Sequence, residues 1–297
     1  MDFVVQTGHL PSPGETVLGH GFRMLPGGKG ANQACAAGRL ADGVIVRMIG
    51  RVGSDIFADN LKASLAAAGV DVSGVTAVST EATGVALIGV DEQGQNSIIV
   101  ASGANGEFPV ADVEGIRSSF GDCRYALFQL ETPLQTVAAA LRLARREGAQ
   151  TILDPAPAQP LAVDLLREVD ILTPNESEAC LLLGRPVARV SREEAPALAR
   201  AVLQTGPKSV VLKLGETGCL YVNGTSETYA PAFKVAALDS TAAGDTFNAA
   251  LAVALTEGRE MPDALRFANA AAAISVTRMG AQASIPSRSE VDAFLSP

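Results

Sequence analysis

The second half of the chain alternates short apolar runs with stretches in which apolar residues recur at helical spacing. The runs predict strands near residues 125–130, 151–154, 169–172 and 209–214, with a further strand pair at 219–222 and 227–229. The stretches predict helices near residues 133–147, 175–183, 192–204, 243–257, 262–277 and 289–295. Strands that alternate with helices predict an α/β fold, with a mostly parallel sheet covered by helices on both faces.

The first half of the chain has a different pattern. Residues 3–7 and 16–25 are expected to be extended, and residues 83–90 and 96–100 flank a polar turn as in a β-hairpin. We expect these segments to form a small separate sheet, built from discontinuous strands near 3–25 and 83–104. A helix near 34–40, a strand at 44–49 and a helix at 54–68 that ends at Gly69 are expected between them. No repeat or low-complexity linker interrupts the chain, which predicts one domain over residues 1–297.

Composition narrows the functional classes. A hydrophobic content of 47% with 19% charged residues is typical of a globular protein, and a net charge of −9 argues against a nucleic-acid partner. No apolar run is long enough for a membrane span, and the first residues lack the pattern of a signal peptide, so we expect a cytoplasmic protein without a membrane partner. Two histidines leave little for a histidine-based zinc site or triad. Four scattered cysteines predict reduced thiols, at Cys35, Cys123, Cys180 and Cys219.

The candidate chemistry begins at residues 238–247, where a polar loop leads into an apolar helix. Gly244 lets the backbone approach a ligand, and the first amides of a helix form a natural anion site. Asp245 places a carboxylate in that site. From these residues alone, it is either a general base or an acid that favours the helix dipole.

A second glycine-rich stretch lies at residues 26–34 and also leads into a helix. It is not a Walker A loop, because Gly30 follows Lys29 where Ser or Thr is required. It is not a dinucleotide fingerprint, because no strand-linked G-x-G-x-x-G is present. Taken alone, it is equally consistent with a plain turn before a helix.

Together these two motifs resemble those of the ribokinase-like (phosphofructokinase-B type) sugar kinases, and further landmarks extend the resemblance over nearly the whole chain. It implies a three-layer α/β fold with a small β-sheet lid. It also implies ATP-dependent phosphorylation of D-ribose at its 5-hydroxyl. Asp245 would be the catalytic base, and the amides of Ala243, Gly244 and Asp245 would stabilise the transferring phosphoryl group.

The resemblance also implies a sugar site. Its contacts would be Asp2, Gly28, Lys29, Gly30, Ala31, Asn32, Glu131 and Asp245. The residues alone leave Asp2 open as a solvated charge. Glu131 follows an apolar strand, at the end where open α/β sheets bind ligands.

The implied nucleotide site draws on later segments. Its contacts would be Asn175, Lys213, Leu214, Gly215, Glu216, Thr217, Gly218, Gly244, Asp245 and Asn269. Asn175 and Glu178 match a motif that supports the magnesium and phosphate region, although alone they are a helix cap and a first-turn acid. Asp154 matches another family segment, with a proline-stiffened strand exit as the alternative, and Asn269 is alternatively an ordinary helix-surface residue.

A monovalent-cation site is implied by the loop at 278–284 together with the loop before Asp245. Its ligands would be Asp239, Thr241, Ser275, Arg278, Gly280 and Ser284, mostly through backbone oxygens. The family pattern therefore implies ATP, Mg²⁺ and K⁺, and a homodimer joined through the lid.

Several alternatives stay open. One alternative to ribose phosphorylation is a kinase for a related sugar or nucleoside, such as deoxyribose, fructose or adenosine. Another is a sugar- or nucleotide-binding protein without catalytic activity. Members of the family also begin with an apolar strand and a sugar-contacting Asn ahead of the residue that matches Asp2. We therefore expect the natural start to lie upstream of Met1, the alternative being a variant whose sheet tolerates the loss.

Overall fold

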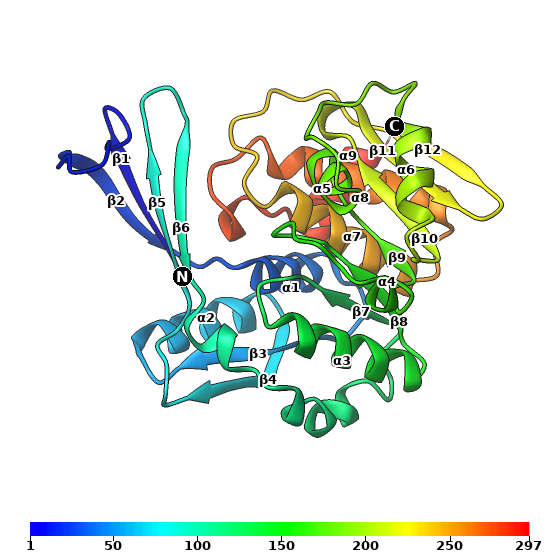
Figure 1. Cartoon of the computed structure of the whole chain (residues 1–297), viewed down its shortest axis with the longest axis horizontal. Coiled ribbons are helices and arrows are strands. Elements are labelled where there is room, and N and C mark those ends of the chain that lie inside the picture. Colours follow the sequence, from blue (N-terminus) through cyan, green and yellow to red (C-terminus); the bar gives the residue numbers. More distant parts are fainter. Residues whose placement is uncertain (297) are drawn as a thin grey trace.

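The computed structural model describes residues 1–296 and shows an α/β body from which a four-stranded sheet projects (Figure 1). The body is built on a six-stranded sheet in the order β12-β11-β10-β9-β8-β7. Its strands are β7 (Tyr125–Phe128), β8 (Gln150–Leu153), β9 (Ile171–Leu172), β10 (Ser209–Lys213), β11 (Gly218–Asn223) and β12 (Glu227–Pro231). The strands β7 to β10 are parallel, and β11 and β12 add an antiparallel edge.

Helices cover both faces of this sheet because successive strand residues point to opposite sides. Ile152 packs with α7 (Ala243–Thr256), α8 (Met261–Ser275) and α9 (Arg288–Leu295). The next residue, Leu153, packs in a second core. That core is shared with α3 (Leu134–Arg146), α4 (Val163–Leu166), α5 (Glu176–Leu182) and α6 (Ala195–Leu203). The predicted three-layer fold class is confirmed.

The projecting sheet has the order β2-β1-β5-β6. Its strands are β1 (Asp2–Thr7), β2 (Gly19–Leu25), β5 (Val85–Val90) and β6 (Asn96–Ala101). The chain begins at the base of this sheet, where it meets the body (Figure 1). The antiparallel pairing of β5 with β6 is the hairpin expected from the sequence.

Between the two halves lie α1 (Lys29–Leu40), β3 (Val46–Gly53), α2 (Ile56–Ala67) and β4 (Val70–Val78). The sequence did not predict β4, because the alternation of apolar residues is broken at Gly74, where its register with β3 shifts. Five short 3₁₀ helices were also not predicted, at Gly103–Glu107, Val110–Asp112, Glu114–Ser119, Gly215–Thr217 and Gln282–Ser284. Gly69 follows α2 as expected, with a φ of 83°.

The strands β3 and β4 form a sheet of their own. Within residues 1–296, β3 pairs only with β4, and β7 pairs only with β8. The free edges of β3 and β7 line the same cavity, through residues that include Met48 and Phe128.

Two further findings concern the cysteines and the possibility of a membrane-spanning helix. All four cysteines are unpaired, and Cys123 alone is partly exposed while the other three are buried. No helix in residues 1–296 combines the length and the apolar character required to cross a bilayer.

Candidate active site

A cavity of about 1340 Å³ lies where the projecting sheet meets the body. Asp2 of β1, Lys29 and Asn32 of α1, Glu131 after β7 and Asp245 of α7 all line it. These residues are up to 243 positions apart in the sequence, from Asp2 to Asp245. The fold therefore brings the predicted sugar contacts and the predicted base to one hollow.

Asp245 lies in the first turn of α7 and is 6% exposed. Its two carboxylate oxygens accept hydrogen bonds from the side chains of Asn32, at 3.1 Å, and Gln33, at 3.0 Å. Burial raises the pKa of Asp245, and the nearby Asp154 carboxylate adds to the increase, while Lys29 and the two amide donors oppose it. A carboxylate with a raised pKa is suited to accept a proton.

The start of α7 offers free backbone donors beside Asp245. Ala242 at the N-cap has a left-handed φ of 57°, which turns the chain sharply into the helix. The Ala243 amide donates to the Ser240 carbonyl, whereas the Gly244 and Asp245 amides have no partner in the part of the chain that is described. Two amides therefore remain at the positive end of the helix dipole, which is a seat for an anion.

The glycine-rich turn places α1 against this seat. Gly28 is the N-cap of α1 with a φ of 94°, a conformation that side chains other than glycine rarely adopt. Asn32 is buried, and its Oδ1 has no hydrogen-bond partner among the described residues. An orphaned acceptor of this kind is satisfied when a ligand hydroxyl donates to it.

Lys29 brings a positive charge to the same region. Burial lowers the pKa of Lys29, but the carboxylates of Asp245, Asp154, Glu131 and Glu178 outweigh that effect and raise it. The ammonium is therefore charged, and no salt bridge engages it within residues 1–296. It is free to contact a ligand.

Asp2 and Glu131 close the other side of the hollow. A side chain at Gly27 would overlap the Asp2 carboxylate, so the glycine is what lets Asp2 lie against the turn. Burial raises the pKa of Asp2. Glu131 accepts a hydrogen bond from the Lys29 backbone amide at 2.9 Å, which fixes this carboxylate beside the turn.

The predicted nucleotide contacts gather at the ends of β9 and β10. Asn175 caps α5 and exchanges hydrogen bonds with Glu178 in a capping box, and it forms an isolated bridge with Lys213. The segment from Leu214 to Gly218 forms a tight turn through a bond from the Leu214 amide to the Gly218 carbonyl, at 2.8 Å. Lys213, the last residue of β10 before this turn, pairs through its ammonium with Asp154, 2.9 Å away.

Asn269 lies on α8 and is 7% exposed, so it is not an ordinary surface residue. Its side-chain amide donates to the carbonyls of Ala230 and Pro231, each at 3.1 Å. These bonds hold the end of β12 beside the nucleotide turn. They also engage the side-chain N–H donors with which Asn269 would otherwise contact an adenine ring.

The predicted cation ligands lie on two loops that Asp239 joins. The carboxylate accepts from the amide of Thr241 at 2.9 Å and from the amide of Gly280 at 2.8 Å. Burial raises the pKa of Asp239, but a hydrogen bond from the Thr241 hydroxyl and these two amide bonds outweigh it and lower the pKa, so the group is ionised. The Arg278 side chain points away to Glu290, and the hydroxyls of Ser275 and Ser284 bond to carbonyls of their own turns. Their backbone oxygens remain as candidate ligands.

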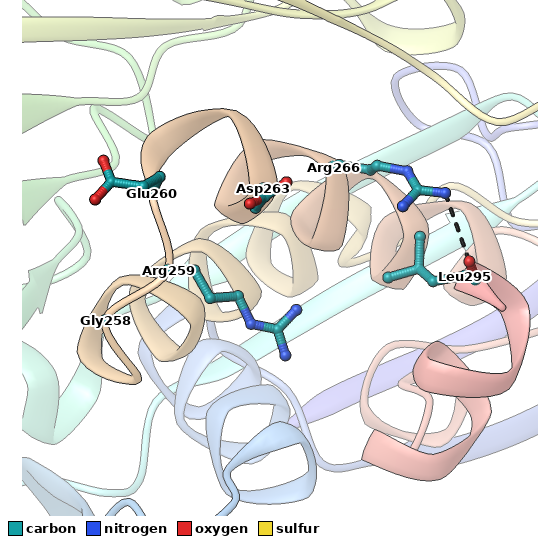
Figure 2. Close-up of a pocket in the computed structure, with 6 residues that line it drawn as sticks. All are labelled: Gly258, Arg259, Glu260, Asp263, Arg266 and Leu295. Carbon is teal, nitrogen blue, oxygen red and sulfur yellow. Dashed lines mark hydrogen bonds between the residues drawn. The ribbon is translucent and has the colours of Figure 1, made fainter.

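A second hollow, of about 390 Å³, lies between the α7–α8 turn and the C-terminal helix. Figure 2 shows the Arg266 guanidinium reaching the Leu295 carbonyl across it, at 3.5 Å. The neighbouring Arg259 pairs with Glu257 and packs on the Phe267 ring. These charges are engaged with the protein, so this hollow is a poor candidate for the site.

Sequence reasoning gave no role to two residues that link the parts of the site. Gln33 donates from one nitrogen to both Asp154 and Asp245, at 3.1 and 3.0 Å. Gln129 in turn donates to the Gln33 side-chain oxygen. The sequence feature that could have identified Gln33 is its position in the glycine-rich motif, directly after Asn32.

Comparisons with known proteins show the family to which the chain belongs. The pfkB family carbohydrate kinase model matches residues 1–288. The chain is 41% identical to the ribokinase of Haemophilus influenzae over 294 residues, which are 99% of this chain and 95% of that protein.

Solved structures show the same similarity. The ribokinase of Thermotoga maritima superposes with a TM-score of 0.88 at 40% identity, covering 99% of this chain and 95% of that one. The ribokinase of Arabidopsis thaliana, solved in complex with ribose and ATP, superposes with a TM-score of 0.89 at 34% identity, with the same coverage.

Proposed function

Since this chain belongs to the pfkB family of carbohydrate kinases, we propose that it transfers the terminal phosphoryl group of ATP to the 5-hydroxyl of D-ribose. The observation that carries the proposal is the buried Asp245 carboxylate beside two free helix amides. A proton acceptor and an anion seat at one point are what phosphoryl transfer to an alcohol requires. The relative that binds ribose and ATP supports the choice of both substrates.

The sugar lies between α1 and the projecting sheet. The carboxylates of Asp2 and Glu131 accept from its hydroxyls, and the orphaned Oδ1 of Asn32 accepts from another. The Lys29 ammonium donates to a sugar oxygen. These contacts turn the 5-hydroxyl toward Asp245, and positioning of this kind supplies much of the rate enhancement.

Asp245 takes the proton of the 5-hydroxyl as its oxygen bonds to the γ-phosphorus. The bond from that phosphorus to the bridging oxygen breaks, and ADP leaves with the electron pair. The Gly244 and Asp245 amides stabilise the charge on the transferring oxygens. Ribose 5-phosphate, ADP and a proton are the products.

Mg²⁺ bound to the nucleotide would neutralise phosphate charge. Burial raises the pKa of Glu178, so a cation near this carboxylate would stabilise its ionised form. Glu178 and Asn175 are the residues that would hold the ion, directly or through water. Across residues 1–296, no group of three or more His, Cys, Asp or Glu side chains forms a protein-only metal cage.

We assign K⁺ to the two loops that Asp239 joins. The donor set would consist of oxygens, from the ionised Asp239, Thr241 and the backbone of residues 275–284, and such ligands suit a hard cation. The loop from Asp239 leads directly into α7. An ion here would therefore stabilise the backbone that forms the anion seat.

The four-stranded sheet is proposed to act as a lid. Ile98 and Val100 of β6 line the cavity and are 53% and 60% exposed, so closure over a sugar would bury them. Exclusion of water prevents hydrolysis of ATP at the same site. The opposite face of the sheet is proposed to join two copies of the chain in a homodimer.

A coupled assay for ADP release, run over a panel of sugars and nucleosides, tests this function. We expect the highest kcat/KM with D-ribose, with 2-deoxyribose, fructose and adenosine as competitors in the panel. Higher kcat/KM with a competitor would reassign the substrate, and no sugar-dependent ADP release would contradict kinase activity.

A further inference from the structure

Buried polar side chains connect the nucleotide turn to the proposed base. Lys213 pairs with Asp154 through one carboxylate oxygen, at 2.9 Å, and Gln33 donates to the other, at 3.1 Å. The same Gln33 nitrogen donates to Asp245, at 3.0 Å. Asp154 is 3% exposed and Gln33 is 2% exposed, so both are withdrawn from bulk water.

The orientation of the Gln33 side chain follows from these partners. Its nitrogen has two hydrogens, and each meets one carboxylate. The reversed amide would place its oxygen against two carboxylates and leave both without their donor. Gln129 donates to the Gln33 oxygen on the far side and fixes the same orientation.

The other end of the network reaches the anion seat. A side-chain carbon at Gly244 would lie 3.5 Å from the Lys213 nitrogen. The ammonium therefore lies beside the free amides of α7 and forms an ion pair with Asp154. One connected set of hydrogen bonds thus fixes the position of the proposed proton acceptor, Asp245, and the position of the Lys213 ammonium at the anion site.

We propose that Gln33 and Asp154 are positioning residues that hold Asp245 and the Lys213 ammonium in one arrangement for phosphoryl transfer. This inference rests on the proposed kinase function. Asp154 ties Lys213 to Gln33, and Gln33 ties that pair to Asp245. Neither Gln33 nor Asp154 needs to touch a substrate.

The charges around Asp245 give the network a measurable signature. Lys29 of α1 favours the ionised form of Asp245, and Asp154, at the end of β8, disfavours it. Glu131 and Glu178 lie near Lys29, and Lys213 of β10 neutralises Asp154. Changing one member of the Lys213–Asp154 pair therefore shifts the ionisation of the base, whereas changing both leaves it nearly balanced.

The experiment compares four variants by the pH dependence of kcat/KM, whose acidic limb reports ionisation of the base. Asp154→Asn removes a negative charge, so the pKa of Asp245 falls and the limb moves to lower pH, by roughly one unit. Lys213→Met leaves Asp154 uncompensated, so the limb moves to higher pH. The double variant returns the limb close to its position in the parent protein. Lys208→Met, the matched control, removes an ammonium from buried Asp170, 2.6 Å away, and leaves the limb in place.

A fifth variant tests Gln33. Gln33→Met keeps the side-chain length but removes both donors, so kcat falls by about 10–100-fold while the KM values for ribose and ATP change little. A residue with a merely structural role would lower the amount of folded protein without this division between kcat and KM. Thermal unfolding of each variant checks that point.

An acidic limb that stays in place in both single variants overturns the inference, as does an unchanged kcat in Gln33→Met. Failure of the proposed function is seen separately, as a parent protein that phosphorylates no sugar. In that case, binding titrations with ATP and with adenosine test where the Lys213 ammonium lies. Lys213→Met weakens ATP binding by at least about tenfold and spares adenosine if the ammonium lies at the phosphates, and equal ATP affinity overturns that placement.

Discussion

At the residue scale, Asp245 owes its proposed reactivity to its surroundings. Burial and the nearby Asp154 carboxylate raise the pKa, while Lys29 and two side-chain amides favour the ionised form. The result is a carboxylate with a raised pKa, which makes it a better proton acceptor than an exposed aspartate. Its oxygens are also fixed in direction, because Asn32 and Gln33 each hold one of them.

Asp245→Ala is therefore expected to lower kcat by about 10²–10⁴-fold, the usual contribution of a general base. Ribose binding should remain, because the other proposed sugar contacts are untouched. Steady-state kinetics together with calorimetric titration of ribose would measure the two effects. Asp164→Asn is the control, because the Asp164 side chain is 83% exposed and lies outside the cavity. A variant that kept most of its kcat would remove Asp245 from the role of base.

The sequence allowed prediction of some residues of the site and not of others. Asp245, Lys29 and Asn32 stand in compact motifs, where spacing alone places them at helix starts. The link from Gln33 to Asp154 spans 121 positions, and it depends on side-chain orientation in the packed core. Such contacts leave no periodicity in the sequence, so they emerge only from the coordinates.

At the scale of elements, the long helices and central strands were predictable because their apolar spacing is regular. The strand β4 was missed, because a register shift interrupts its alternation. The loops around Asp239 show a different limit. Residues 239–241 and 280 are joined by hydrogen bonds to one carboxylate, a tertiary arrangement that neither loop signals alone.

These loops lead to a prediction about monovalent cations. Potassium should raise kcat several-fold over a buffer containing only tetramethylammonium, because a cation at Asp239 would stabilise the loop that enters α7. The initial rate as a function of potassium concentration measures the effect. Asp239→Asn should remove most of the activation while the protein still unfolds cooperatively. Equal rates in the two buffers would exclude a cation site that affects the rate.

The projecting sheet leads to a prediction about assembly. Met24 of β2, Leu87 of β5 and Ile99 of β6 lie on one face of the sheet. Phe3 of β1 pairs with both Met24 and Leu87, and Leu87 pairs with Ile99. Their side chains are 56%, 51% and 65% exposed. Exposed apolar residues gathered on one sheet face are typical of an interface.

Ile99→Lys should therefore convert a dimer into a monomer, because a charge would be buried where that face meets the second copy. Light scattering coupled to size-exclusion chromatography measures the mass. Val187→Lys is the matched control, since Val187 is also exposed, at 56%, but lies outside this sheet. A parent protein that runs as a monomer at working concentration would contradict the proposed interface.

At the scale of the whole molecule, the body consists of two sheets instead of one. The six-stranded sheet ends at β7, and the β3–β4 pair stands apart from it across the cavity. The residues of β7 are all partly exposed, whereas residues 209–212 of the central strand β10 are buried. Backbone groups on the free edges of β3 and β7 therefore face the cavity instead of a neighbouring strand.

The last prediction concerns this open edge and is measured by hydrogen exchange. Alternate amides of β7 bond to β8, and the remaining ones face the cavity, so the latter can exchange without any opening of the fold. The strand β10 pairs on both sides, with β9 and β11, and its amides exchange only when the sheet opens. We expect the cavity-facing amides of β7 to exchange at least about 10²-fold faster than those of β10. Mass spectrometry of peptides covering residues 124–130 and 209–214 makes the comparison, with β8 as the internal control because it pairs with both β7 and β9. Equal protection of β7 and β10 would contradict the open edge and show that β7 has a partner on its second side in solution.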